Sequence, residues 1–89
     1  MNRDLTPRER AIAAINNSVS ELSDIETILL KWQYRMYGDF YTALFDAITR
    51  ADDTNCEKLA LGFPREVMAF RLWQTTWIAE SLRVRGLLD

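Results

Sequence analysis

A tight corner between two helices is the feature of this sequence that most constrains its fold. The run Leu61-Gly62-Phe63-Pro64 places a glycine two positions before a proline. Glycine can end a helix in a left-handed conformation, whereas proline fits the first turn of the next helix, where its missing N–H is not needed. The run therefore predicts that one helix ends at Gly62 and another begins at Pro64, with Phe63 turned into the core.

Further signals for helix starts and ends divide the rest of the chain. Thr6–Glu9 and Ser23–Glu26 both have a hydroxyl residue followed three positions later by glutamate, which is the spacing of a capping box. Gly38 suits a helix end and Asp39 a following N-cap, while Gly86 is placed to stop the last helix. Apolar residues recur at helical intervals between these signals, and no segment shows the alternation of a strand.

These signals predict an all-α fold in a single domain over residues 1–89, with a flexible tail at 1–5, since a chain of 89 residues has room for only one core. We expect a small orthogonal bundle of four to five helices, at about residues 6–20, 23–37, 39–51, 54–60 and 64–85. The first two helices could also form one continuous rod, because the apolar stripe from Ile12 to Leu22 runs on toward the second helix. The second capping box favours separate helices with a junction around Val19 to Ser23.

The third helix is expected to bury one face against the rest of the domain. The residues assigned to this face are Phe40, Ala43, Leu44, Ala47 and Ile48, with Phe45 near its edge.

The composition is rich in apolar and aromatic residues. Apolar residues make up 48% of the chain and aromatic residues 11%, which excludes an intrinsically disordered chain. So many rings cannot all be buried in one thin core. A second copy of the chain or another protein could cover the surplus. Half-buried rings with their polar edges in water would account for the same composition.

The charge pattern argues against a strongly charged partner. The net charge is −2, and acidic residues outnumber basic ones between Glu21 and Glu57. A nucleic-acid binder usually has a denser basic face, and a protein that mimics DNA would be more acidic. The corner does resemble a helix-turn-helix, with Arg65 and Glu66 near the start of its second helix. A small nucleic-acid-associated regulator that uses the 62–66 corner and the basic termini is therefore the alternative function.

The residues that most enzymes need are missing. The chain has no histidine, one cysteine (Cys56) and three widely separated glycines, so it offers no Ser-His or Cys-His nucleophile and no phosphate-binding loop. The acidic run from Asp52 to Glu57 lacks the pattern of a calcium loop and is interpreted as a capping loop rather than a metal site. We expect no catalytic activity, no cofactor and no metal. Because the sequence has neither a signal-peptide pattern nor an apolar run long enough to cross a bilayer, we expect a cytoplasmic protein without membrane contact.

The last predicted helix carries the candidate binding residues. Phe70, Trp73 and Trp77 follow at helical spacing and form one stripe, which Arg71, Arg83 and Arg85 flank. Tryptophan and arginine are frequent in binding hot spots, so the stripe could anchor a protein partner. Packing in the core is the other interpretation of the same spacing.

The middle of the chain resembles small uncharacterised helical proteins of bacteriophages and prophages. The resemblance covers about residues 36–70 and lies in Met36–Phe40, Ala43–Phe45, Ala51-Asp52, Asn55, Lys58-Leu59 and Gly62–Val67. It implies a mobile-element protein made in a bacterial cytoplasm, either an inhibitor of a host protein or an assembly or regulatory accessory. We therefore expect a non-enzymatic helical module that binds another protein, with a homodimer as a further state.

Overall fold

The computed structural model describes residues 5–17 and 22–89, which contain six α-helices and no strand. The helices are α1 (Pro7–Asn16), α2 (Asp24–Gln33), α3 (Asp39–Arg50), α4 (Asp53–Gly62), α5 (Pro64–Thr75) and α6 (Ile78–Val84). The predicted all-α fold class is confirmed, with more helices than the four to five expected.

Both predicted capping boxes are present. The Thr6 hydroxyl accepts a hydrogen bond from the Glu9 N–H, and the Glu9 carboxylate accepts one from the Thr6 N–H; Ser23 and Glu26 repeat this exchange at the start of α2. α1 ends at Asn16 rather than at residue 20, so α1 and α2 are separate helices. Residues 18–21, which include most of the expected junction, lie outside the described part of the chain.

The corner at residues 61–64 lies where the sequence predicts it, but its geometry differs. Gly62 is the last residue of α4, and Phe63 (φ −135°, ψ 60°) makes the turn into α5. The expectation of a left-handed Gly62 is wrong, because its φ is not positive. Among the described glycines, only Gly86 has a positive φ. Phe63 supplies the bend itself and lies half-buried against the core.

Two helices instead end through a left-handed residue. Gly86, with φ 75°, follows α6 as predicted, and Arg35, with φ 54°, follows α2. At Arg35 the Met36 N–H returns to the Lys31 carbonyl at 2.8 Å, the hydrogen bond typical of a Schellman ending. α2 thus ends before residue 37.

Gly38 and Asp39 do not have the roles that the sequence suggested for them. Gly38 is the extended N-cap of α3 and Asp39 its first helical residue, so neither the predicted helix end at Gly38 nor the cap at Asp39 is correct. The left-handed Arg35 has already ended α2 three residues earlier, which leaves Gly38 to begin α3.

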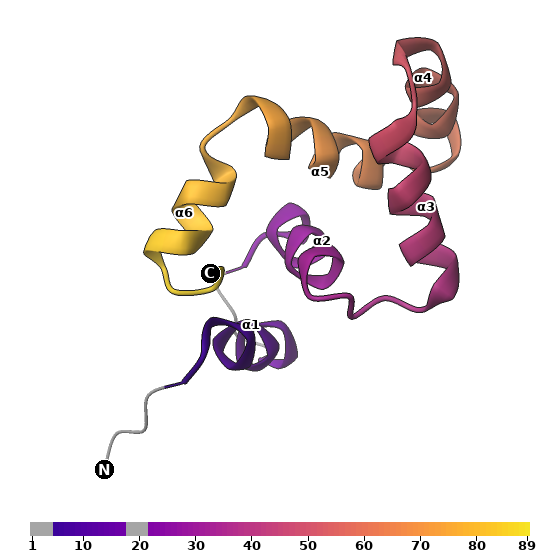
Figure 1. The fold of residues 1–89 in the computed structure, drawn as a ribbon. Coiled ribbons are helices and arrows are strands. Elements are labelled where there is room, and N and C mark those ends of the chain that lie inside the picture. The colour runs from indigo at the N-terminus through magenta and orange to yellow at the C-terminus, as the bar shows by residue number, and fades with distance from the viewer. Residues whose placement is uncertain (1–4, 18–21) are drawn as a thin grey trace.

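The expected helix at 64–85 is broken into α5 and α6. Thr76 is extended (φ −129°, ψ 177°), and its hydroxyl donates to the Leu72 carbonyl at 2.6 Å and accepts the Ile78 N–H at 3.3 Å. A threonine hydroxyl competes in this way with the helical hydrogen bonds of the backbone. The break lets α6 turn away and pack beside another part of α2 (Figure 1).

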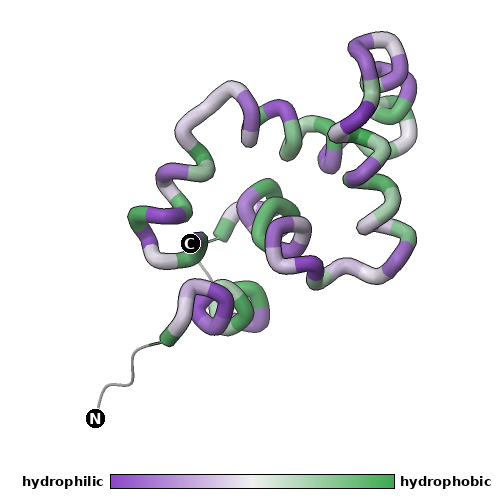
Figure 2. The backbone as a smooth tube through the Cα atoms, in the orientation of Figure 1, coloured by the Kyte–Doolittle hydropathy of each residue, from purple (hydrophilic) through white to green (hydrophobic). Residues whose placement is uncertain are grey.

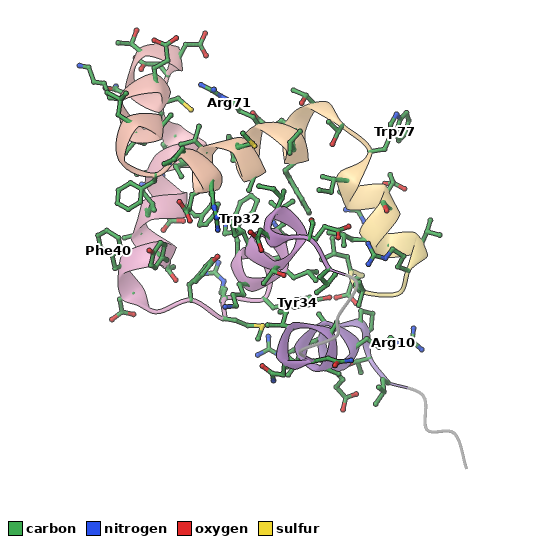
Figure 3. All side chains as sticks on the ribbon, turned by 180° about the vertical axis from the view of Figure 1, so that it is seen from behind. Arg10, Trp32, Tyr34, Phe40, Arg71 and Trp77 are labelled. Carbon is green, nitrogen blue, oxygen red and sulfur yellow. The ribbon has the colours of Figure 1, made fainter. Side chains whose placement is uncertain are left out.

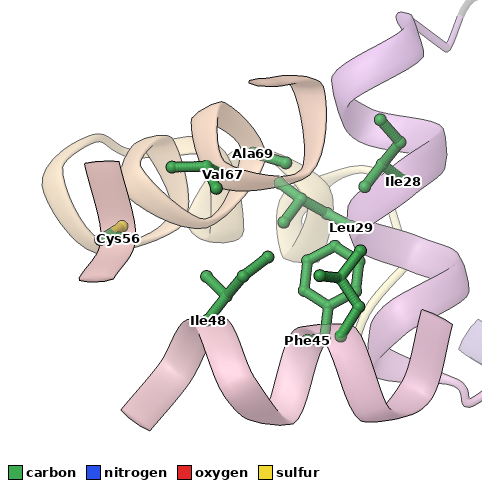
Figure 4. Packing of buried hydrophobic residues seen from close by; sticks show 8 residues of the cluster. Ile28, Leu29, Phe45, Ile48, Cys56, Val67 and Ala69 are labelled. Carbon is green, nitrogen blue, oxygen red and sulfur yellow. The ribbon is translucent and has the colours of Figure 1, made fainter. Parts of the chain in front are cut away.

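The other helices surround α2 (Figure 1), and hydrophobic and hydrophilic residues are interspersed along the helices (Figure 2). The first cluster, shown in Figure 4, joins α2 to α3, α4 and α5 and contains Ile28, Leu29, Leu44, Phe45, Ile48, Cys56, Val67 and Ala69. The second cluster lies on the other side of α2 and contains Ala11, Leu30, Leu82, Leu87 and Leu88. Trp73 packs against both clusters.

The buried face of α3 differs from the predicted one. Phe45, expected near the edge, is fully buried, whereas Phe40 is 62% exposed and Ala43 and Ala47 are also exposed. Leu44, Phe45 and Ile48 therefore define the inner face, and the first turn of α3 extends beyond the core.

Candidate functional site

The predicted aromatic stripe is divided between the core and the surface. Phe70 and Trp73 both meet the ring of Trp32 edge-on, with ring centroids 5.9 and 5.6 Å away. Trp77 lies beyond the break in the helix, at the N-cap of α6, and is 82% exposed. Because the chain changes direction at Thr76, the three rings share no face.

The three flanking arginines are also dispersed. Arg71 points toward the Cys56 sulfur at 3.8 Å, on the side of α4. Arg83 pairs with Glu80 at 2.7 Å, and Arg85 pairs with Glu26 of α2 at 2.6 Å. The structure therefore does not gather the six predicted residues into one surface.

Four aromatic rings form a continuous surface elsewhere, which we call the aromatic patch: Tyr37, Phe40, Tyr41 and Phe63. Tyr37 lies 5.1 Å from Tyr41, Tyr41 lies 5.3 Å from Phe40, and Phe40 lies 5.8 Å from Phe63, measured between ring centroids. Tyr37 lies in the turn before α3, Phe40 and Tyr41 lie in the first turn of α3, and Phe63 lies at the corner between α4 and α5. Phe40 and Trp77 lie on opposite sides of the molecule (Figure 3).

A pocket of about 140 Å³ adjoins the aromatic patch between α2 and α3. Tyr37 belongs to both, so the two features form one surface. The residues that line the pocket are Lys31, Trp32, Gln33, Arg35, Tyr37, Thr42 and Asp46. Its polar walls thus carry two cations and one carboxylate around aromatic rings.

Tyr37 has the most perturbed environment in this surface. Burial of its hydroxyl, with smaller contributions from the nearby Glu66 carboxylate and from Tyr41, raises the pKa of Tyr37 to about 12. The Lys31 ammonium lies 5.7 Å from the centroid of the Tyr37 ring, a cation–π distance. The Tyr37 hydroxyl is therefore uncharged at physiological pH, and its ring belongs to both the pocket and the patch.

Local sequence patterns do not predict this site. Tyr37, Phe40 and Tyr41 do lie three and four positions apart, but Gly38 separates the first from the others and Phe40 was assigned to the buried face. Phe63 is far away in sequence and joins them only through the path of α4. Arg35 was not singled out, because an arginine in the left-handed conformation has no local signature.

The acidic run and the corner both make local structural contacts. Asp52 accepts the Asn55 N–H at 2.8 Å as the N-cap of α4, as the capping-loop interpretation predicts. Within residues 5–17 and 22–89, no three carboxylate or thiol groups come close enough to hold a metal ion. At the corner, Arg65 pairs with Asp24 at 3.3 Å. None of the helices described is both long and apolar enough to cross a membrane.

Comparison with protein-family models, with curated proteins and with solved structures finds no match to this chain. The aromatic patch and its adjoining pocket are therefore the features from which a function is proposed.

Proposed function

We propose that the protein is a non-enzymatic helical module that binds another protein through the aromatic patch. The exposure of Phe40 carries this proposal, because the ring is 62% exposed while it contacts both Tyr41 and Phe63. A single exposed apolar residue is ordinary on protein surfaces. In the patch, Phe40 and Tyr41 are exposed beside the half-buried Tyr37 and Phe63. Contiguous apolar surface of this kind is typical of an interaction site, and tyrosine in particular is enriched in binding hot spots.

The resemblance of residues 36–70 to small phage and prophage proteins supports a cellular context for this module. It favours a protein that acts in a bacterial cytoplasm, as an inhibitor of a host protein or as an assembly or regulatory accessory. The aromatic patch falls within the resembling segment.

Two matched variants test the proposal. Phe40→Ala removes the centre of the patch, and Trp77→Ala removes a ring that is even more exposed, on the opposite side of the molecule (Figure 3). We expect immobilised wild-type protein and Trp77→Ala to capture the same bacterial protein, and Phe40→Ala to lose it. Both variants should keep the wild-type helical circular dichroism spectrum, because neither ring belongs to the buried core. Equal capture by all three proteins would refute the role of the patch.

Light scattering after size exclusion separates a partner protein from a second copy. We expect a 10.4 kDa species at micromolar concentration. A dimer that Phe40→Ala dissociates would assign the patch to self-association and overturn the proposal of a different partner.

A further inference from the structure

We infer that the pocket beside the aromatic patch binds a carboxylate, so that the partner segment is acidic: an Asp or Glu side chain enters the pocket while a neighbouring apolar side chain covers the patch. This inference rests on the proposed function and names the chemistry of the partner. It starts from the continuity of the two features through Tyr37, whose ring both lines the pocket and contacts Tyr41.

The cations of the pocket are available to a ligand. Neither Lys31 nor Arg35 forms a salt bridge with any residue that the structure describes, whereas Arg65, Arg83 and Arg85 all do. Lys31 instead lies over the ring of Tyr37. Two unpaired cations at the rim of one pocket favour a charge-assisted bond to a carboxylate, and the arginine can make it bidentate.

The carboxylate of Asp46 limits what the pocket can take. It offsets one of the two positive charges, which leaves a net charge that suits one carboxylate. A nucleic-acid backbone, which presents a negative charge at every nucleotide, would bring further phosphates toward Asp46. An acidic peptide segment is therefore favoured over a nucleic acid.

The aromatic wall of the pocket is held in place by the core. Trp32 stacks on the buried ring of Phe45 with their centroids 5.1 Å apart and their planes 14° from parallel. Phe70 and Trp73 contact Trp32 at its edges. A rigid apolar wall excludes water from one side of a bound carboxylate, which strengthens its attraction to the cations.

Arg35 provides an independent observation. It holds the left-handed position at the end of α2, where glycine is the usual residue, with φ 54°. A strained backbone at the edge of a pocket is frequently associated with function. The same position allows a direct test, because Arg35→Gly removes the guanidinium without adding backbone strain. A loss of binding with an unchanged circular dichroism spectrum is then due to the lost side chain.

A peptide display selection tests the inference. Random twelve-residue peptides are selected on the wild-type protein, on Arg35→Gly, on Phe40→Ala and on Arg50→Gln, an exposed arginine of α3 outside the pocket. On wild type and Arg50→Gln we expect enrichment of Asp or Glu next to an apolar residue. Arg35→Gly should keep the apolar preference and lose the acidic one, and Phe40→Ala should lose the apolar preference.

The affinity of the best peptide completes the test. Replacing its acidic residue with the matching amide should weaken binding to wild type about 10-fold, and should change binding to Arg35→Gly less than about 2-fold. Asp46→Asn should bind the acidic peptide more tightly. An apolar preference without an acidic one in the wild type would overturn this inference alone, whereas no enrichment, or enrichment that Phe40→Ala leaves intact, would overturn the proposed function as well. Binding of a single-stranded oligonucleotide that Arg35→Gly abolishes would assign the pocket to phosphate and also overturn the inference.

Discussion

Leu29 and Leu30 are neighbours on α2 and both are fully buried, yet they face different surroundings. Leu29 belongs to the first cluster, whose walls are the helices α3, α4 and α5. Leu30 belongs to the second, which is closed by α1, α6 and the segment after α6. Two adjacent residues of one type thus separate a core made from helices alone from a core made partly from the segment that follows α6.

Polar contacts join the elements that surround the second cluster. The Tyr34 hydroxyl donates to the Leu87 carbonyl at 2.9 Å, and Arg8 of α1 donates to the Tyr34 carbonyl at 3.0 Å. The pair between Arg85 and Glu26 ties the end of α6 to α2. Short elements with little apolar area of their own are positioned here by specific hydrogen bonds and an ion pair.

Leu29→Ala and Leu30→Ala should show the largest difference between the two clusters. Replacing a buried leucine with alanine costs about 2–5 kcal/mol, and the cost is highest where the cavity cannot collapse. We expect Leu29→Ala to lie near the upper end, because helices wall its site, and Leu30→Ala near the lower end, because the segment after α6 can shift. Urea denaturation followed by circular dichroism measures both. Equal losses would mean that the two clusters are equally rigid.

Gly86→Ala should destabilise the second cluster by about 1–2 kcal/mol, the cost of a left-handed conformation for a residue with a Cβ. Its φ is 75°, and an added Cβ would lie 2.5 Å from the Arg10 Nη1 atom, which must move. Gly62→Ala is the matched control. That site has no atom within 4 Å of an added Cβ and lies in the last turn of α4, so we expect unchanged or slightly higher stability by thermal unfolding.

Tyr34→Phe removes the hydrogen bond to Leu87 and should lower the free energy of unfolding by about 1 kcal/mol. Tyr41→Phe in the aromatic patch serves as its control, since the Tyr41 hydroxyl makes no hydrogen bond with the residues described. If the two variants lose the same stability in chemical denaturation, the hydrogen bond to Leu87 does not support the second cluster.

The smallest expected difference between the two clusters lies in how the free energy of unfolding depends on alkaline pH. The ordinary pKa of a tyrosine is 10.0. Burial is the main cause that raises the pKa of Tyr37 to about 12, and it also raises the pKa of Tyr34. Above pH 10 the unfolded chain releases these protons before the folded chain does, so the free energy of unfolding falls between pH 10 and 12. Tyr37→Phe should flatten this fall more than Tyr34→Phe. An unchanged slope in Tyr37→Phe would show that the Tyr37 hydroxyl titrates normally.

Local signals predicted the helix starts better than they predicted the ends. The caps at Thr6 and Ser23 and the proline at the first position of α5, Pro64, depend on neighbouring residues alone, and each marks a helix start. The break at Thr76 is not predicted, because threonine lowers helix propensity only slightly. The packing of α6 against the second cluster is a tertiary contact, which a local pattern does not show. The left-handed conformation of Arg35 is not predicted either, because arginine carries no local signal for it.

The candidate site depends on tertiary structure to a greater degree. Spacing alone placed Phe70, Trp73 and Trp77 on one face, and this holds only while the helix continues past Thr76. The aromatic patch needs Phe63 beside Phe40, and the pocket needs α3 beside the end of α2. Neither neighbourhood is encoded in a local pattern.

The pairing of α2 with α5 has a consequence for the rate of folding. α2 packs most extensively against α5, although α3 and α4 lie between them in the chain. The loop that joins them must close before the first cluster can form, and closing a long loop costs chain entropy. We therefore expect this protein to refold more slowly than a helical bundle of equal length whose sequential helices pair with each other.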